Sequence, residues 1–168
     1  STELPVVDST DADMTLLSSL KLSDCKIRKV LGMKTLPSSN YFVIADDRSN
    51  LTVFQSNGYK LSVICYLYMR DSSKWNDAKV QLTGAMSADD EHLYAIDADD
   101  GRIVRMLIPW INLDNHRDAK LEKIGCCAQV FAQNRAMFKT IAVDVAQQEL
   151  YATNDSDLLV YSTVNRSE

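Results

Sequence analysis

The chain has 168 residues, of which 46% are apolar and 24% are charged, and its formal net charge at pH 7 is -5. This length suits one globular core, and no apolar run approaches the roughly 18 residues of a membrane-spanning helix. The acidic balance argues against general attraction to nucleic-acid backbones. We expect a flexible acidic arm over residues 1–13, where Asp8, Asp11 and Asp13 stand among Ser, Thr and Pro, followed by one domain over 14–168.

From residue 14 onward, apolar residues occur in runs of four to eight, separated by Asp, Asn, Ser and Gly. This spacing is typical of β-strands, and it lacks the 3.6-residue period of helices, so the predicted fold class is all-β. The predicted strands are 15–22, 27–33, 41–45, 51–55, 62–68, 81–86, 93–96, 103–108, 128–131, 140–143, 150–153 and 158–162. A helical turn is expected only over the polar stretch 112–121.

A strand–turn–strand phrase occurs three times, over 42–54, 93–106 and 150–161. Asp46, Asp97 and Asn154 close the first strand of the three copies. Their side chains are expected to accept backbone N–H bonds in the turns, as Asp and Asn do in tight connections. Another strand precedes each phrase, and the apolar runs 61–67 and 107–111 are candidates for a fourth strand in the first two copies.

Units of about 50 residues with three or four antiparallel strands bury only one face when alone, so they must stack. Radial stacking of such units predicts about three propeller-like blades, a half or incomplete β-propeller. A β-sandwich or barrel is the alternative. Residues in the middle of the repeated strands are expected to be buried, namely Ile44, Val53, Ile96, Val104, Ile141, Val143, Leu150 and Val160.

The third copy resembles the NHL-type repeat of six-bladed propellers. Thr140-Ile-Ala-Val-Asp144, Glu149-Leu-Tyr-Ala-Thr-Asn154 and Leu158-Leu-Val-Tyr161 match its successive strands, with Thr140 where the family usually has glycine. The other two phrases are similar, so the resemblance covers about three repeats. It implies a propeller that binds proteins or RNA across one face of the ring.

Three blades leave two sheet edges open, and open edges must be covered by another chain. We expect a protein partner, or self-association that completes the propeller. Tryptophans in polar segments and apolar residues of the two terminal strands are the candidate contacts. The predicted partner-binding residues are Trp75, Trp110, Leu16, Leu20, Leu22, Leu159 and Tyr161.

The predicted function is a non-enzymatic protein–protein interaction scaffold that uses propeller loops and open sheet edges. No catalytic motif is recognised, and no metal or cofactor site is predicted. One alternative is an RNA-binding NHL-like module in post-transcriptional regulation, in which aromatic and basic side chains stack on bases. Its candidate residues are Arg28, Lys29, Arg48, Tyr59 and Lys60.

The second alternative is a calcium-dependent, lactonase-like hydrolase. Carboxylates are the ligands that calcium prefers, and the sequence contains several adjacent acidic pairs. Three of them fall in predicted turns, namely Asp46-Asp47, Asp89-Asp90 and Asp99-Asp100. In such turns, acidic residues more often serve as solvated turn residues.

The predicted location is the cytoplasm. Four cysteines, Cys25, Cys65, Cys126 and Cys127, are too sparse for a disulfide scaffold and are interpreted as reduced thiols. Three N-glycosylation sequons, at Asn50, Asn154 and Asn165, leave secretion as the alternative.

Overall fold

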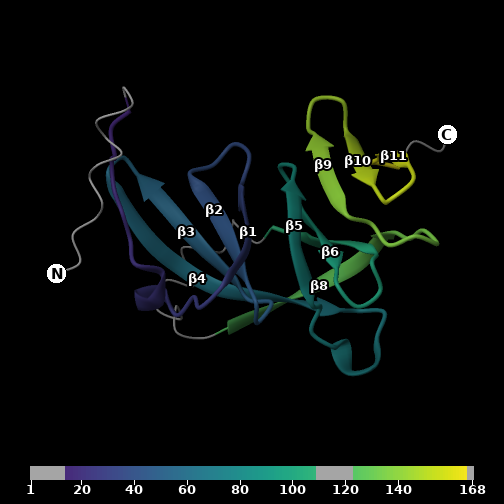
Figure 1. Cartoon of the computed structure of the whole chain (residues 1–168), viewed down its shortest axis with the longest axis horizontal. Coiled ribbons are helices and arrows are strands. Elements are labelled where there is room, and N and C mark those ends of the chain that lie inside the picture. The colour runs from purple at the N-terminus through teal and green to yellow at the C-terminus, as the bar shows by residue number, and fades with distance from the viewer. Residues whose placement is uncertain (1–13, 109–122, 166–168) are drawn as a thin grey trace.

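The computed structural model describes residues 14–108 and 123–165, and its regular structure there consists of strands and two short 3₁₀ helices (Figure 1). The all-β prediction is confirmed. Three further predictions lie outside the described residues, namely the arm over 1–13, the helical turn over 112–121 and Trp110.

Three antiparallel units follow one another along the chain. Unit 1 comprises β1 (Val30–Thr35), β2 (Tyr41–Asp46), β3 (Leu51–Asn57) and β4 (Lys60–Asp71). Unit 2 comprises β5 (Leu82–Ala88), β6 (His92–Asp97), β7 (Ile103–Leu107) and β8 (Lys123–Ala132). Unit 3 comprises β9 (Thr140–Asp144), β10 (Glu149–Thr153) and β11 (Leu158–Ser162).

Units 1 and 2 join through their last strands into one eight-stranded sheet. Strand β4 is long enough to pair with two strands. Its first part pairs with β3 in antiparallel orientation, and its second part pairs with β8 in parallel orientation. Tyr66 lies at the changeover, because it pairs with both Thr52 and Lys123. Of the fourth strand predicted over 107–111, Leu107 is the last residue of β7 and residues 109–111 lie outside the described residues. Strand β8 pairs with β7 as the fourth strand of unit 2.

The units stack face to face, with a layer of buried apolar side chains between neighbouring units. One layer joins units 1 and 2, and a second joins units 2 and 3. The two-residue period of a strand explains this order. On β6, Leu93 and Ala95 enter the first layer, whereas Tyr94 and Ile96 enter the second.

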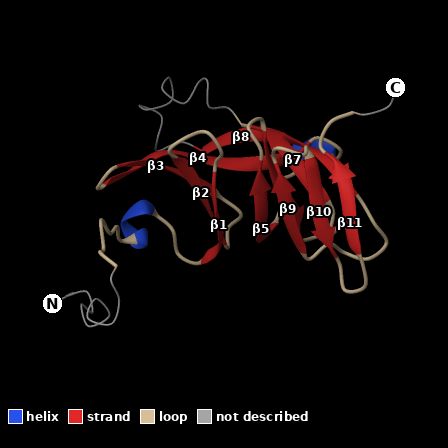
Figure 2. Ribbon diagram, turned by 90° about the horizontal axis from the view of Figure 1, so that it is seen from above, coloured by secondary structure: helices blue, strands red, loops and turns tan. Residues whose placement is uncertain are grey.

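The first strands of the three units, β1, β5 and β9, stand next to one another (Figure 2). Strands β1 and β5 meet at Gly32 and Gly84, where a Cβ on Gly32 would lie 2.1 Å from the carbonyl oxygen of Gly84. Only glycine permits so close an approach of two backbones. The units therefore fan out from their first strands.

A third apolar layer covers the outer face of unit 1. The strand predicted over 15–22 is wrong, because residues 14–21 form no strand and lead into the 3₁₀ helix η2 (Leu22–Cys25). This segment sets buried Cys25 and Ile27 against Ile44 and Phe54. It therefore covers the face of the sheet and does not extend its edge.

The burial predictions divide by unit. In units 1 and 2, Ile44, Val53, Ile96 and Val104 are buried, as is Leu150 on the middle strand of unit 3. Two others, Ile141 and Val143, are half-buried. The prediction that Val160 is buried is wrong, since this residue is 53% exposed on the outer face of unit 3.

Candidate partner-binding surfaces

The repeated Asp/Asn positions serve as turn residues, as predicted. The Oδ1 atom of Asp46 accepts hydrogen bonds from the backbone N–H groups of Arg48 and Asn50. Asp97 Oδ1 accepts the backbone N–H groups of Asp99 and Asp100 in the same way. Asn154 Oδ1 accepts those of Ser156 and Asp157. Each side chain satisfies donors that the sharp chain reversal leaves without strand partners.

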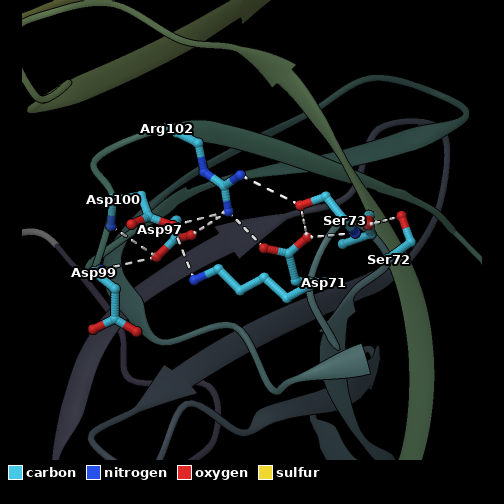
Figure 3. A network of polar contacts seen from close by, with 9 residues as sticks. Asp71, Ser72, Ser73, Asp97, Asp99, Asp100 and Arg102 are labelled. Atoms are coloured by element: carbon cyan, nitrogen blue, oxygen red, sulfur yellow. Dashed lines mark hydrogen bonds and ion pairs between the residues drawn. The ribbon is translucent and has the colours of Figure 1, made fainter. Parts of the chain in front are cut away.

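The Asp97 turn also belongs to a buried ionic cluster between units 1 and 2 (Figure 3). The Nη2 atom of Arg102 lies 2.5 Å from Asp71 Oδ2, 2.9 Å from Asp97 Oδ2 and 3.2 Å from Asp100 Oδ2. Ser73 donates its backbone N–H and hydroxyl to Asp71 Oδ1. The ends of β4 and β6 are thereby tied to the start of β7.

This cluster has the properties of a structural anchor. Burial tends to lower the pKa of Arg102, but hydrogen bonds to Asp97 and Asp71 outweigh burial and raise it. The guanidinium therefore stays charged and occupied by carboxylates. A buried cation surrounded by acids fixes the relative position of the strands that carry them.

The acidic pairs of the hydrolase alternative are engaged in local contacts. Asp89 Oδ1 accepts the backbone N–H groups of Glu91 and His92, and Asp89 Oδ2 accepts the Tyr94 hydroxyl. Asp47 pairs with Arg28. Within residues 14–108 and 123–165, no group of three or more His, Cys, Asp or Glu side chains is arranged to hold a metal ion.

The outer face of unit 3 is an exposed sheet surface with apolar side chains, which we call the unit 3 end face. Ala142, Tyr151 and Val160 lie opposite one another across the three strands, and Leu158 lies one row further along. Leu158 is 69% exposed and Val160 is 53% exposed. On unit 2 the equivalent outer face is covered by unit 3, whereas here no described residue forms such a layer.

Acidic residues border this face. Asp144 and Glu149 occupy the row next to Tyr151, and Asp155 and Asp157 lie in the turn between β10 and β11. The Tyr151 hydroxyl donates to Glu149, 3.1 Å away. From residue 140 to residue 162 the chain contains four acidic residues and no Lys or Arg.

A second apolar surface lies at the opposite end of the molecule, on the segment that covers unit 1 (Figure 1). Tyr66 donates its hydroxyl to the carbonyl of Cys25 and holds this segment in place. We call its outward side the N-terminal face. It exposes Met14, Leu16, Leu17, Leu20 and Leu22.

Basic side chains are exposed on the described part of the N-terminal segment. Residues 14–29 contain four Lys or Arg and one Asp, and the sequence before residue 14 contains Glu3, Asp8, Asp11 and Asp13. Lys21, Lys26, Arg28 and Lys29 are all exposed. Among the described residues, both ends of the molecule expose apolar side chains.

The predicted partner-binding residues fall into three groups. Leu16, Leu20 and Leu22 are exposed on the N-terminal face. Trp75, 88% exposed, lies in the 3₁₀ helix η3 (Trp75–Asp77) after β4. Leu159 and Tyr161 turn inward against unit 2. The outward residues of β11 are their neighbours Leu158, which the sequence did not single out, and Val160, which was expected to be buried.

The candidate RNA-binding residues are split between two ends of unit 1. Arg28, Lys29 and Arg48 gather at the β2–β3 turn, where Asp47 bonds to Arg28 and to the Lys29 carbonyl. Tyr59 and Lys60 lie at the β3–β4 turn, a strand length away, or about 20 Å.

A hollow of about 240 Å³ opens beside the changeover residue Tyr66. Its lining includes Lys26, Arg48 and Lys123 as well as Asp46 and Asn50. Burial lowers the pKa of nearby Lys79, and the positive charge of Lys123 lowers it further. Three basic side chains against one acidic side chain make this hollow basic.

Comparison with solved structures identifies the architecture. The crystal structure of the Myceliophteria thermophila Cps50 (Swd1) beta-propeller domain superimposes with a TM-score of 0.54 at 8% sequence identity. The match covers 79% of this chain and 40% of that one. The fold is that of a β-propeller. This chain thus spans less than half the length of that propeller domain.

A second likeness is to Myxococcus xanthus glutaminyl cyclase, with a TM-score of 0.43, 12% identity and coverage of 73% of this chain and 53% of that one. No protein-family model matches the sequence, and no curated protein matches it. In the described part of the chain, no helix has the length and apolar character needed to cross a membrane.

Proposed function

We propose that this chain is a non-enzymatic protein-interaction scaffold built of three propeller blades, units 1 to 3, that binds a protein partner through its end surfaces and loops. The observation that carries the proposal is the apolar unit 3 end face, which no residue in the described part of the chain covers. Every other apolar face of the units is covered by a neighbouring unit or by the N-terminal segment. An apolar face with a polar rim is the usual anatomy of a protein interface.

The arrangement of the rest of the molecule supports this role. Its buried ionic cluster is occupied by its own partners, and its turn acids are bonded to backbone groups. Trp75 adds an exposed aromatic anchor on a loop at the junction of units 1 and 2. Aromatic side chains of this kind dominate the energy of many interfaces.

We place the scaffold in the cytoplasm. All four cysteines are free thiols, as expected in a reducing compartment. Two of the three sequon asparagines are buried: Asn50 accepts a hydrogen bond from Lys79, and Asn154 bonds to its own turn. A glycan on either residue would have to displace these contacts.

The test is affinity purification of the tagged chain from its own cells, followed by mass spectrometry. The wild-type chain is expected to bring down a stoichiometric partner, and Val160→Glu is expected to lose it, because a charge replaces an apolar contact. Tyr59→Glu, on an exposed turn of unit 1, is the matched control. Equal recovery with Val160→Glu would contradict a role for the unit 3 end face.

A further inference from the structure

We infer that the basic hollow beside Tyr66 binds a phosphate monoester group. The hollow lies between the N-terminal segment, unit 1 and the start of β8, so the inference goes beyond the proposed function and does not depend on the unit 3 end face. Its volume is about 240 Å³, and its lining residues are Lys26, Asp46, Arg48, Asn50, Tyr66 and Lys123.

The fold brings the three cations of the hollow together from distant parts of the sequence. Lys26 follows Cys25, whose carbonyl oxygen accepts the Tyr66 hydroxyl at 3.1 Å. Lys123 pairs with Tyr66 in the β4–β8 ladder, and Arg48 lies in the turn between β2 and β3. Tyr66 thus helps to place two of the three cations.

These three side chains lack counter-ions. Within residues 14–108 and 123–165, none of them forms an ion pair. Asp47, the neighbour of Arg48, pairs with Arg28 instead. Asp46, the one carboxylate of the lining, uses its Oδ1 to accept two backbone N–H groups of its own turn. Cations that share a concave surface without counter-ions attract an anion.

The local charge balance favours a dianion. Lys79 lies close enough for Lys123 and Asp46 to act on its pKa, and Asp24 stands two residues before Lys26. With Lys79 and Asp24 added to the lining residues, four cations face two carboxylates, an excess of two positive charges. A phosphate monoester carries a charge of about -1.5 to -2 at pH 7, which matches this excess better than the single charge of a carboxylate.

The sequence outside the described residues also contains charges. Residues 109–122 contain three acidic and two basic residues, which amounts to one negative charge. Residues 1–13 contain four acidic residues, Glu3, Asp8, Asp11 and Asp13. These acids would compete with a ligand if they reached the hollow, so the experiment must include a variant that lacks them.

The lining also offers hydrogen-bond donors suited to phosphate oxygens. Asn50 is buried, and its Oδ1 accepts a hydrogen bond from Lys79 Nζ at 2.8 Å. Since an ammonium can only donate, this bond identifies the oxygen of the amide and leaves Nδ2 as a donor without a partner among the described residues. The Arg48 guanidinium can donate two parallel N–H bonds to one phosphate, and the two lysines of the lining add point charges.

The test is isothermal titration calorimetry of the purified full chain with two phosphate monoesters, glycerol phosphate and a short phosphoserine peptide. At least one of them should bind with a Kd of about 1 mM or tighter. The same peptide with glutamate in place of phosphoserine should bind at least about tenfold more weakly, because it carries one charge at that position. Equal affinities for the two monoesters would indicate a free metabolite, and tighter binding of the peptide would indicate a phosphorylated protein; both agree with the inference.

Variants of the lining test the location of the site. Lys26→Gln and Lys123→Gln should each weaken binding by about tenfold, the loss expected for one charge-assisted hydrogen bond. Both side chains are exposed, so the melting temperatures should stay at the wild-type value. Lys60→Gln removes an equally exposed lysine from the β3–β4 turn and should leave binding unchanged.

Absence of binding by either monoester at about ten times the expected Kd would overturn the inference, and so would an equal loss of affinity in Lys60→Gln. Glutamate-peptide binding as tight as phosphopeptide binding would overturn the assignment to phosphate. A single-stranded RNA that displaces the monoester at a far lower concentration would also overturn it, because RNA presents diester phosphates.

The last variant removes the chain's own acids. It combines Glu3→Gln, Asp8→Asn, Asp11→Asn, Asp13→Asn and Glu122→Gln, and its affinity for the monoesters should stay within about threefold of the wild type. A gain of about tenfold or more would show that these acids occupy the hollow in the free protein, which would contradict a site that is open to a ligand.

Discussion

Gly32 on β1 and Gly84 on β5 lie in backbone contact, because a Cβ on Gly32 would approach the Gly84 carbonyl oxygen to 2.1 Å and a Cβ on Gly84 would approach the Leu31 carbonyl oxygen to 2.3 Å. Each glycine thus occupies the space that a side chain on the other strand would need. The pair sets the spacing of units 1 and 2 at their inner strands. Neither strand can take even a methyl group there without moving backbone.

Replacing Gly32 by Ala should therefore destabilise the fold. The clash is with backbone, which cannot rotate away, so we expect a loss of about 1 to 3 kcal/mol or more in the free energy of unfolding. Gly58→Ala is the control: its φ of +61° carries a conformational cost, but nothing lies within 4 Å of its Cβ position. Urea unfolding of both variants gives the comparison, and equal losses would show that β1 and β5 are not in contact.

Arg102→Met should be strongly destabilising. It leaves the carboxylates of Asp71 and Asp97, both almost fully buried, without their cation. Breaking a buried ion pair from one side costs about 3 to 5 kcal/mol in general. Arg48→Met, on an exposed turn, should change the unfolding free energy by less than about 0.5 kcal/mol. A loss for Arg102→Met no larger than that of the control would contradict the anchoring role.

The contribution of Asp71 to stability should disappear in acid. Burial alone would raise the pKa of Asp71, but hydrogen bonds from Ser73 and Arg102 outweigh it and hold the pKa below its usual value of 3.8. Because the folded-state pKa is the lower one, this stabilisation is present above about pH 4 and is lost as the pH falls through the folded value.

Urea midpoints measured from pH 7 to pH 2.5 check this for the wild type and Asp71→Asn. The gap between the two proteins should be widest near neutral pH and should narrow below about pH 4. A gap that is constant across this range would mean that Asp71 is not ionised in the folded protein.

The cysteines should react in order of exposure. Burial, with a smaller effect of neighbouring Cys126, raises the pKa of Cys65 to about 12, and Cys127 is exposed. Since the thiolate is the reactive form, a thiol reagent at pH 8 should label Cys127 first and Cys65 only after unfolding. Mass spectrometry of timed digests measures the order. Early labelling of Cys65 would place β4 outside the layer between units 1 and 2.

The middle strands could be predicted from the sequence because both of their faces are buried. Phe42 to Ala45 and Leu93 to Ile96 are continuous apolar runs, and they form β2 and β6. The Asp/Asn turn positions could be predicted for a similar reason, since the bonds they form are local. The sequence could not show which of the two faces of a strand points inward.

Strand β11 illustrates that limit. Leu158, Leu159, Val160 and Tyr161 are all apolar, so the pattern does not distinguish the two faces. Packing against unit 2 determines which face of β11 points inward. There the ring of Phe131 packs edge-on against Tyr161, with ring centroids 5.9 Å apart. The predicted contact residues Leu159 and Tyr161 therefore lie on the inner side.

Long-range pairing accounts for the remaining differences. The first half of β8 was not predicted because its partner is β4, and Tyr66 and Lys123 are 57 positions apart in the sequence. The ionic cluster was missed for the same reason: Asp97 was predicted as a turn residue, but its second carboxylate oxygen holds Arg102 together with Asp71. No local pattern marks Asp71 as a partner of Arg102.

The most direct test of the central claim, that the unit 3 end face is a protein-binding surface, is hydroxyl-radical footprinting of the chain in an extract of its own cells and as a dilute purified protein. Labelling of Leu158, Val160 and Tyr151 should fall several-fold in the extract, whereas the inward residue Leu159 should be protected in both samples. Equal labelling of Leu158 and Val160 in the two samples would contradict the account.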